Sequence, residues 1–197
     1  MIAMRNPALL SIVLTLAACV NMTQVGPGEV PLGDRLVANP GLAWNRLEAP
    51  GMGRVELWTR DGFPLDTLRF FLGIREGEPL VEQRGAKDKQ VPKFRAGMQE
   101  REIVEMFEAA AADAGTVRID RVAPASFAGQ SATRFEYTLT RKGDEVVVKG
   151  FAYAAVRDRE LFMAVFQAPR IHYFARHAEA AEAVLRSVRF KGAGKGS

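Results

Sequence analysis

The stretch Glu160-Leu-Phe-Met-Ala-Val-Phe-Gln-Ala168 decides the fold of this chain. Alternate side chains of an extended strand point to opposite faces, and here both sets are apolar. One set is Leu161, Met163 and Val165, and the other is Phe162, Ala164 and Phe166. A strand that is apolar on both faces lies in a sheet that is covered on both sides. The stretch therefore predicts helices on both faces of a sheet rather than one layer exposed to water.

Three further predicted strands precede this stretch and lead into it through short turns. They span residues 117–122, 132–140 and 145–156. The turns contain Gly129-Gln130, Lys142-Gly143-Asp144 and Arg157-Asp158-Arg159. Because turns this short join antiparallel neighbours, the four strands predict an antiparallel meander.

Two amphipathic helices flank the meander in the sequence. Residues 98–114 place Ile103 and Phe107 on one helical stripe, start with an excess of glutamate and end at Gly115. Residues 169–188 form the second helix after Pro169. Its stripe consists of Ile171, Phe174, Ala178, Ala181, Leu185 and Val188. These two helices are the expected covers of the sheet.

A β-hairpin is predicted before the first helix. Residues 54–59 and 68–74 alternate as strands, and Asp61-Gly62 with Pro64 forms the turn. Residues 36–40 and 42–47 are predicted as short strands at an edge. The chain is therefore expected to have an α+β fold, with an antiparallel sheet of about six or seven strands flanked by helices on both faces.

The hairpin and the loop that follows it offer two candidate partner-binding surfaces. Trp58, Arg69 and Phe71 could form an aromatic and basic patch on one hairpin face, although a covering helix is the simpler interpretation. Residues 75–97 form a long charged loop that could meet anionic lipid, lipopolysaccharide or an acidic protein. Its candidate contact residues are Arg84, Lys87, Lys89, Lys93 and Arg95. A solvated loop without a binding role is the alternative.

The start of the chain has the pattern of an export signal. Residues 1–5 carry a positive charge, and residues 8–18 form an apolar segment that is too short to span a membrane. The segment closes on Leu16-Ala17-Ala18-Cys19, which contains the chain's single cysteine. This tetrad resembles the lipobox of bacterial lipoproteins. The alternative is a signal that is cleaved elsewhere, with Cys19 incidental.

The lipobox resemblance implies a location. Residues 1–18 would be a signal peptide, and Cys19 would become the acylated first residue, with palmitate among its chains. Two or more acyl chains make membrane anchoring durable. Val20 stands where aspartate retains such proteins at the inner membrane, so the resemblance favours the outer membrane and a domain facing the periplasm.

Composition suggests the remaining domain boundaries. Residues 19–35 are rich in glycine and proline, which predicts a flexible tether. Residues 36–190 have the size of a single α+β domain. Residues 191–197 are polar and glycine-rich, which predicts a disordered tail.

The sequence contains no recognisable catalytic constellation. With Cys19 acylated, no thiol remains for a disulfide, a metal or a nucleophile. His172 and His177 are about 140° apart around a helix, so they are expected at its surface rather than as a zinc pair. Asp61 and Asp66 are expected to be turn residues. We therefore predict no catalytic residue, no metal and no cofactor, and no nucleic-acid partner because the formal net charge of +4 is dispersed.

The order of elements resembles that of PsbP-like proteins, named after an extrinsic subunit of the photosystem. The similarity includes the ending Val-Leu-Arg-Ser-Val-Arg-Phe at residues 184–190. A second stretch, residues 58–74, resembles uncharacterised proteobacterial lipoproteins. The resemblance implies an α/β/α sandwich and an accessory or assembly role beside larger complexes. It supplies no catalytic motif.

Two functions follow as hypotheses. The first is a non-enzymatic accessory protein, anchored to an envelope membrane through Cys19, that engages an envelope protein. The second is a periplasmic binder of a small molecule or lipid, with an enzyme as the weaker variant. Its pocket would lie between sheet and helix and be lined by aromatic residues such as Trp44, Trp58 and Phe71.

Overall fold

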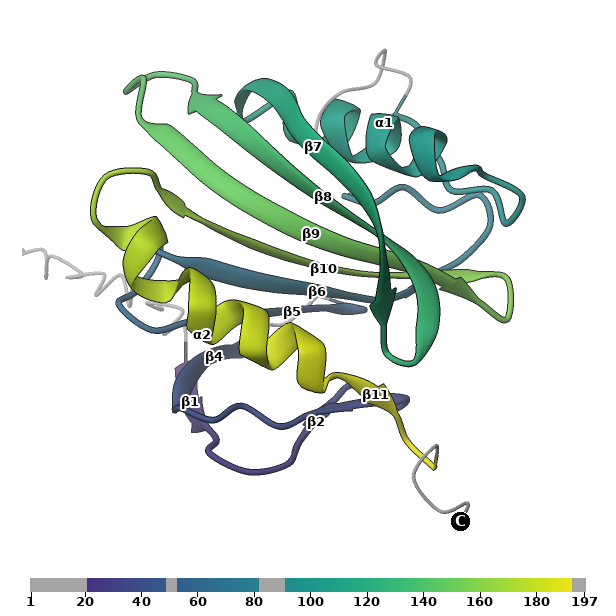
Figure 1. Ribbon diagram of the computed structural model, residues 1–197, viewed down its shortest axis with the longest axis horizontal. Helices are drawn as coiled ribbons and strands as arrows, with labels where there is room; N and C mark the ends of the chain where they lie inside the picture. The colour runs from purple at the N-terminus through teal and green to yellow at the C-terminus, as the bar shows by residue number, and fades with distance from the viewer. Residues whose placement is uncertain (1–20, 49–52, 82–90, 193–197) are drawn as a thin grey trace, which may run out of the picture.

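The computed structural model of the chain describes residues 21–48, 53–81 and 91–192. An eight-stranded sheet, with every neighbouring pair antiparallel, forms its centre (Figure 1). In spatial order its strands are β1 (Asn21–Val25), β4 (Trp44–Glu48), β5 (Val55–Thr59), β6 (Thr67–Ile74), β10 (Glu160–Pro169), β9 (Val147–Arg157), β8 (Gln130–Arg141) and β7 (Gly115–Phe127). The predicted meander, β7 to β10, and the predicted hairpin, β5 and β6, are both confirmed.

A smaller sheet and two helices complete the described structure. The small sheet has three strands, in the order β11 (Arg189–Phe190), β3 (Leu36–Ala38) and β2 (Val30–Leu32). The helices are α1 (Glu100–Ala111) and α2 (Tyr173–Ser187). In Figure 1, α2 crosses the main sheet close to the small sheet, and α1 lies beside β7.

Strand β10 holds the two halves of the main sheet together. It pairs with β9 on one side and with β6 on the other, so it joins the meander to the hairpin. Its alternating apolar side chains divide as predicted. Phe162, Ala164 and Phe166 belong to one core cluster, and Leu161, Met163 and Val165 belong to a second. The doubly apolar strand is therefore central and buried on both faces.

Different elements cover the two faces. The first cluster contains α2 residues such as Leu185 together with Leu32, Leu36 and Phe190 of the small sheet. The second contains α1 residues such as Phe107 together with Leu80 and Phe94 of the segment before the helix. The α+β class and the antiparallel sheet are as predicted, but the sheet is larger. The prediction that helices flank both faces needs correction, because the two short helices do not cover the sheet by themselves.

The predicted tether at residues 19–35 also needs correction. Within it, β1 pairs with β4, and β2 pairs with β3. Val30 and Leu32 are buried while Pro31 between them is exposed, which is the alternation of a half-buried edge strand. Proline at an edge strand removes no needed donor, so the Gly- and Pro-rich composition was misleading here. The signal peptide, Cys19 and residues 193–197 of the predicted tail lie outside the described residues.

The second helix begins later than predicted. β10 continues to Pro169, and the Arg170 amide donates to the Val147 carbonyl oxygen. His172 then adopts a positive φ of 72°, and the helix starts at Tyr173. Ile171, predicted on the buried stripe, is therefore 78% exposed.

Candidate functional site

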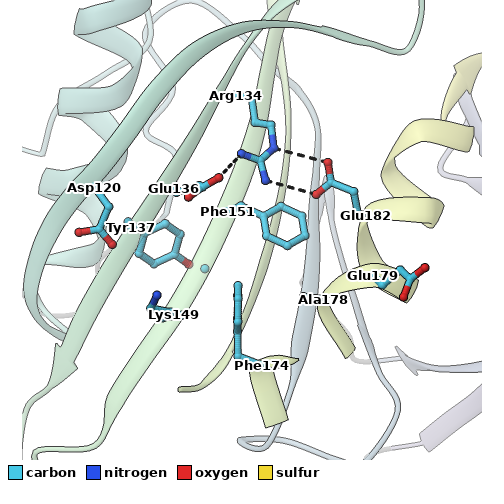
Figure 2. Close-up of a pocket in the computed structure, with 11 residues that line it drawn as sticks. Asp120, Arg134, Glu136, Tyr137, Lys149, Phe151, Phe174, Ala178, Glu179 and Glu182 are labelled. Carbon is cyan, nitrogen blue, oxygen red and sulfur yellow. Dashed lines mark hydrogen bonds and ion pairs between the residues drawn. The ribbon is translucent and has the colours of Figure 1, made fainter. Parts of the chain in front are cut away.

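A groove between α2 and strands β8 and β9 is the clearest candidate site (Figure 2). Its volume is about 310 Å³. We call it the α2 groove and define it by Asp120, Arg134, Glu136, Lys149, Phe151, Phe174, Glu179 and Glu182. The strand residues point outward from the sheet, and the α2 residues face them across the opening.

Arg134 occupies the centre of the α2 groove and is held on three sides. Its guanidinium donates to Glu136 at 2.5 Å, and its Nε lies 3.5 Å from a Glu182 oxygen. Its Cζ lies 5.2 Å from the centre of the Phe151 ring. Partial burial disfavours the charge, but the bond to Glu136 and the charge of Glu182 outweigh burial and raise the pKa of Arg134. Arg134 is therefore fixed as a cation between two carboxylates, as Figure 2 shows.

Glu182 connects α2 to the sheet. Besides Arg134, it accepts a hydrogen bond from the Tyr153 hydroxyl. Burial and then this bond to Glu182 raise the pKa of Tyr153, so the tyrosine remains a donor at neutral pH. Arg186, one helical turn further along α2, lies 3.5 Å from the same carboxylate. The charges here are paired within the protein, which makes this centre a positioning network rather than an acid–base pair.

Two aromatic rings form the apolar part of the α2 groove. The ring centres of Phe151 and Phe174 lie 6.4 Å apart in an edge-to-face arrangement. Phe174 is only half-buried, so part of its ring faces the opening. Such rings can pack against an aliphatic or cationic side chain of a bound partner.

Acidic groups outnumber basic ones around this aromatic floor. Asp120, Glu136, Glu179 and Glu182 face two cations, Arg134 and Lys149. A bond from the Thr138 hydroxyl, 2.6 Å long, holds the pKa of Asp120 below its usual value. Among the described residues, no three His, Cys, Asp or Glu side chains are placed to share a metal ion. The groove is thus suited to a cationic or polar segment.

A second depression, which we call the α1 cavity, lies on the opposite face of the main sheet. Its volume is about 240 Å³, and it lies between α1 and strands β6, β8 and β10. Phe71, Phe107, Leu139 and Val165 are among its apolar walls, and Arg69 is its one strand cation. The Arg69 guanidinium lies 5.9 Å from the Phe71 ring centre.

The predicted hairpin patch is not formed. Trp58 pairs with Leu68 across β5 and β6, so these two side chains share a face, while Arg69 lies on the other face with Phe71. Trp58 is fully buried and packs edge-to-face against Phe70 with the ring centres 5.0 Å apart. The cation above Trp58 is Arg46, its neighbour on β4. The pocket lining predicted from Trp44, Trp58 and Phe71 is also wrong for the tryptophans, which are both core residues.

Two of the five candidate contact residues of the loop fall within the described residues. Lys93 and Arg95 are both exposed, and Arg95 pairs with Glu102 at 2.6 Å. Arg84, Lys87 and Lys89 lie in residues 82–90, outside the described part of the chain. Between the two described cations, Phe94 is fully buried, so this end of the loop is fixed to the core.

The prediction that both histidines lie at the surface is wrong for His177. His172 is exposed, but His177 is only 2% exposed, and its Nε2 lies 2.7 Å from Asp61 Oδ2. This bond is the main cause of a lowered pKa of Asp61. Asp66 does hold the turn as predicted, because it accepts hydrogen bonds from the backbone amides of Arg60 and Asp61 at 2.8 Å. No local sequence pattern predicts a contact between residues that are 116 positions apart.

The residues of the α2 groove were also not predicted as site residues from the sequence. Arg134 and Glu136 were visible as the polar side of an alternating strand, which is the usual pattern of a solvated face. Glu182 lies 48 positions from Arg134, and only the folding of α2 onto the sheet brings it there. Within the described residues, no helix is long and apolar enough to cross a membrane.

Comparisons with known proteins identify the fold. No protein-family model matches the chain, and no curated protein matches its sequence. The structure is similar to the solution structure of cyanobacterial PsbP (CyanoP) from Synechocystis sp. PCC 6803, with a TM-score of 0.52 and 13% identity over 92% of this chain and 98% of CyanoP.

Two other solved structures show a weaker likeness. A protein from Bacteroides thetaiotaomicron VPI-5482 has a TM-score of 0.45 and 12% identity, over 82% of this chain and 47% of that one. LpqN, involved in cell envelope biogenesis in Mycobacterium tuberculosis, has a TM-score of 0.36 and 9% identity, over 89% of this chain and 87% of LpqN. Both scores are too low to carry an argument. The likeness to CyanoP shows that this chain has a PsbP-like α+β fold.

Proposed function

We propose that this chain is a lipid-anchored, non-enzymatic accessory protein of the bacterial cell envelope. Acyl chains on Cys19 hold it on a membrane, with its domain in the periplasm and with the outer membrane favoured over the inner. The support is the lipobox-like tetrad at residues 16–19, which follows a charged start and a short apolar segment.

The α2 groove is the surface through which this protein engages an envelope partner. The observation that carries this proposal is the excess of carboxylates over an aromatic floor, with the central cation Arg134 already neutralised by Glu136 and Glu182. Arg118 and Arg186 offset Asp120 and Glu182 from beside the groove, so the negative charge that remains for a partner is centred on Glu179. The partner segment is expected to be basic where it meets Glu179. Glu179 is exposed at the rim and is free to meet such a segment first.

Site-specific cross-linking tests this proposal. A photoreactive residue at Glu179, in the full chain within its native envelope, is expected to capture one protein through a segment rich in lysine or arginine. The same residue at Arg101 of α1, whose side chain is 89% exposed, serves as the matched control and is expected not to capture it. Equal capture from both positions would remove the groove as the contact surface.

Charge reversal separates the groove from the basic loop. The double variant Asp120→Lys and Glu179→Lys is expected to abolish capture of the partner. Replacing Arg84, Lys87 and Lys89 with serine is expected to leave capture unchanged. The opposite pattern would transfer the partner contact to the loop, together with its neighbours Lys93 and Arg95.

The anchor has its own test. Cys19→Ser is expected to release the protein from the membrane fraction and to prevent labelling by a palmitate analogue. An unacylated Cys19 in the native protein would refute the anchor and leave the groove proposal standing.

A second candidate function is the binding of a small molecule or lipid between sheet and helix. The α1 cavity favours it, because this cavity combines apolar walls with a polar end.

A further inference from the structure

The α1 cavity has its polar groups gathered at one end of its apolar lining. Thr67 and Gln167 are paired across β6 and β10, and Arg69 is the next residue of β6 on the same face. Walls from Phe71, Phe107 and Val165 are apolar. One cavity thus offers a polar end to a head group and apolar walls to a hydrocarbon chain.

Arg69 lacks a countercharge within the described part of the chain. It is half-buried, and the structure shows no ion pair between its guanidinium and a described carboxylate. Burial lowers the pKa of Arg69, and Tyr137 opposes this shift, but an arginine remains charged at neutral pH. A cation that is partly removed from water and left unpaired is costly, and an anion that enters the cavity would offset this cost.

Gln167 lines the same end of the cavity as Arg69 and can supply a second donor. The Tyr137 hydroxyl donates to Gln167 Oε1 at 2.9 Å, so the amide N–H groups of Gln167 are what it can offer to a ligand. Burial raises the pKa of Tyr137, so its hydroxyl keeps its proton at neutral pH. Two adjacent donors, one of them charged, match the two oxygens of a carboxylate.

Asp113 is the one acid among the described residues that line the cavity, and it does not cancel this site. Asp113 follows the end of α1 and is exposed, so water screens its charge. The Asp113 side chain also interacts with another group of the protein.

The volume limits the ligand. A cavity of about 150 Å³ accommodates benzene, so by proportion the 240 Å³ of the α1 cavity accommodates about ten non-hydrogen atoms. That is the size of a medium-chain fatty acid or of the head end of a longer one.

We propose that the α1 cavity binds the carboxylate end of a single-chain fatty acid, with Arg69 and Gln167 on the carboxylate and the chain against Phe71, Phe107 and Val165. This proposal rests on the second candidate function, ligand binding between sheet and helix, and names its ligand class and its selective residue.

The test uses the full chain, kept soluble in an amphipol, and two probes of equal length. Octanoate labelled with ¹³C at its carboxyl carbon is titrated below its micelle concentration, and octan-1-ol is the neutral probe. Octanoate is expected to bind at least tenfold more tightly than octanol. Arg69→Met is expected to abolish that preference while leaving octanol binding unchanged, and Arg118→Met, on exposed β7, is the matched control that changes neither.

A second variant keeps the test decisive if Arg69→Met fails to fold. Ala111→Trp fills the cavity from α1 and is expected to block both probes. Equal binding of octanoate and octanol to the native chain would overturn the role of Arg69 but keep the ligand-binding function. Binding of neither probe would overturn both, and binding that survives Ala111→Trp would place the ligand elsewhere.

Discussion

Each face of the main sheet carries a partly buried arginine, and the two arginines differ in their surroundings. On the α2 side, Arg134 is held between Glu136 and Glu182. On the α1 side, Arg69 lines an apolar cavity without a carboxylate partner among the described residues. Fully paired charges stabilise and position a structure, whereas an unpaired, half-buried charge is costly unless a ligand completes it. The α2 side therefore resembles a rigid docking surface. The α1 side resembles a binding site for an anion.

The largest expected effect comes from the layer between the two faces. A Cβ added at Gly150 would lie 2.4 Å from the Tyr137 ring, so Gly150→Ala must displace Tyr137. We expect a loss of about 3 kcal/mol in unfolding free energy, measured by urea denaturation. Gly97→Ala, with open space around its Cβ, is the control and should change little. An unchanged Gly150→Ala midpoint would mean that Tyr137 is not packed against β9.

Removing the paired arginine should be the next largest effect. Arg134→Met removes the cation that Glu136 and Glu182 share and leaves only Arg186 beside Glu182. It should cost about 2 kcal/mol, because both carboxylates lose a charged hydrogen-bond partner in a partly buried setting. Arg134→Lys should recover part of this loss. Denaturation midpoints of the two variants provide the check, and a neutral Arg134→Met would refute the positioning network.

Removing Arg69, which has no carboxylate partner among the described residues, should change stability in the opposite direction. Arg69→Met replaces a half-buried cation with an apolar side chain in an apolar cavity, so the ligand-free protein should gain about 1 kcal/mol or be unchanged. Thermal unfolding without added ligand measures this. A large loss of stability would show that Arg69 is a structural residue, and the contrast between the two faces would then disappear.

The α2 side should also respond to acid. The pKa of Asp61 is lowered in the folded protein, mainly by its hydrogen bond to His177, so the unfolded chain binds its proton first as the pH falls. The resulting stability is present above the unfolded value near pH 4 and is lost as the pH falls through the lower folded value. Urea titrations across this range should show a smaller loss for Asp61→Asn. Asp120 has the same direction of shift and remains in both proteins, so an identical loss would contradict this role of Asp61.

The smallest effect is expected at the exposed pair near α1. Arg95 is largely exposed and Glu102 is partly exposed, and the pair should contribute less than about 0.5 kcal/mol. Arg95→Ala is therefore expected to leave the denaturation midpoint almost unchanged and to leave octanoate binding intact. A large effect on octanoate binding would extend the anion site from the α1 cavity toward the basic loop.

Much of the strand pattern was predictable, because it depends on local alternation. The meander and the hairpin follow from side-chain period and turn residues, and both appear in the structure. The tether prediction failed where proline and glycine occur inside short edge strands, as at Pro31 of β2. The prediction that Ile171 is buried on the second helix was wrong, because β10 continues to Pro169 and the chain turns at His172 before the helix starts.

The candidate sites were not predictable, because each depends on strand register or on a contact between segments far apart in the sequence. The hairpin patch joined Trp58 to Arg69 and Phe71, but the pairing of Trp58 with Leu68 places them on opposite faces. His177 has the spacing of a surface residue, yet Asp61 meets it from a turn 116 positions away. A shift of one residue in pairing moves a side chain to the other face, so an error of one residue in the expected register is enough to misplace a surface patch.

The sequence by itself determined that β10 lies at the centre of a sheet covered on both sides, because only such a position buries apolar side chains on both of its faces. The tertiary structure alone decided what covers each face, and which of the two arginines has a carboxylate partner among the described residues. Arg134 meets Glu182 only after α2 packs on the sheet, and Arg69 lies under α1 because β6 pairs with β10. The alternation of a strand determines the face of the sheet toward which a side chain points. Strand order and register determine which groups that side chain contacts.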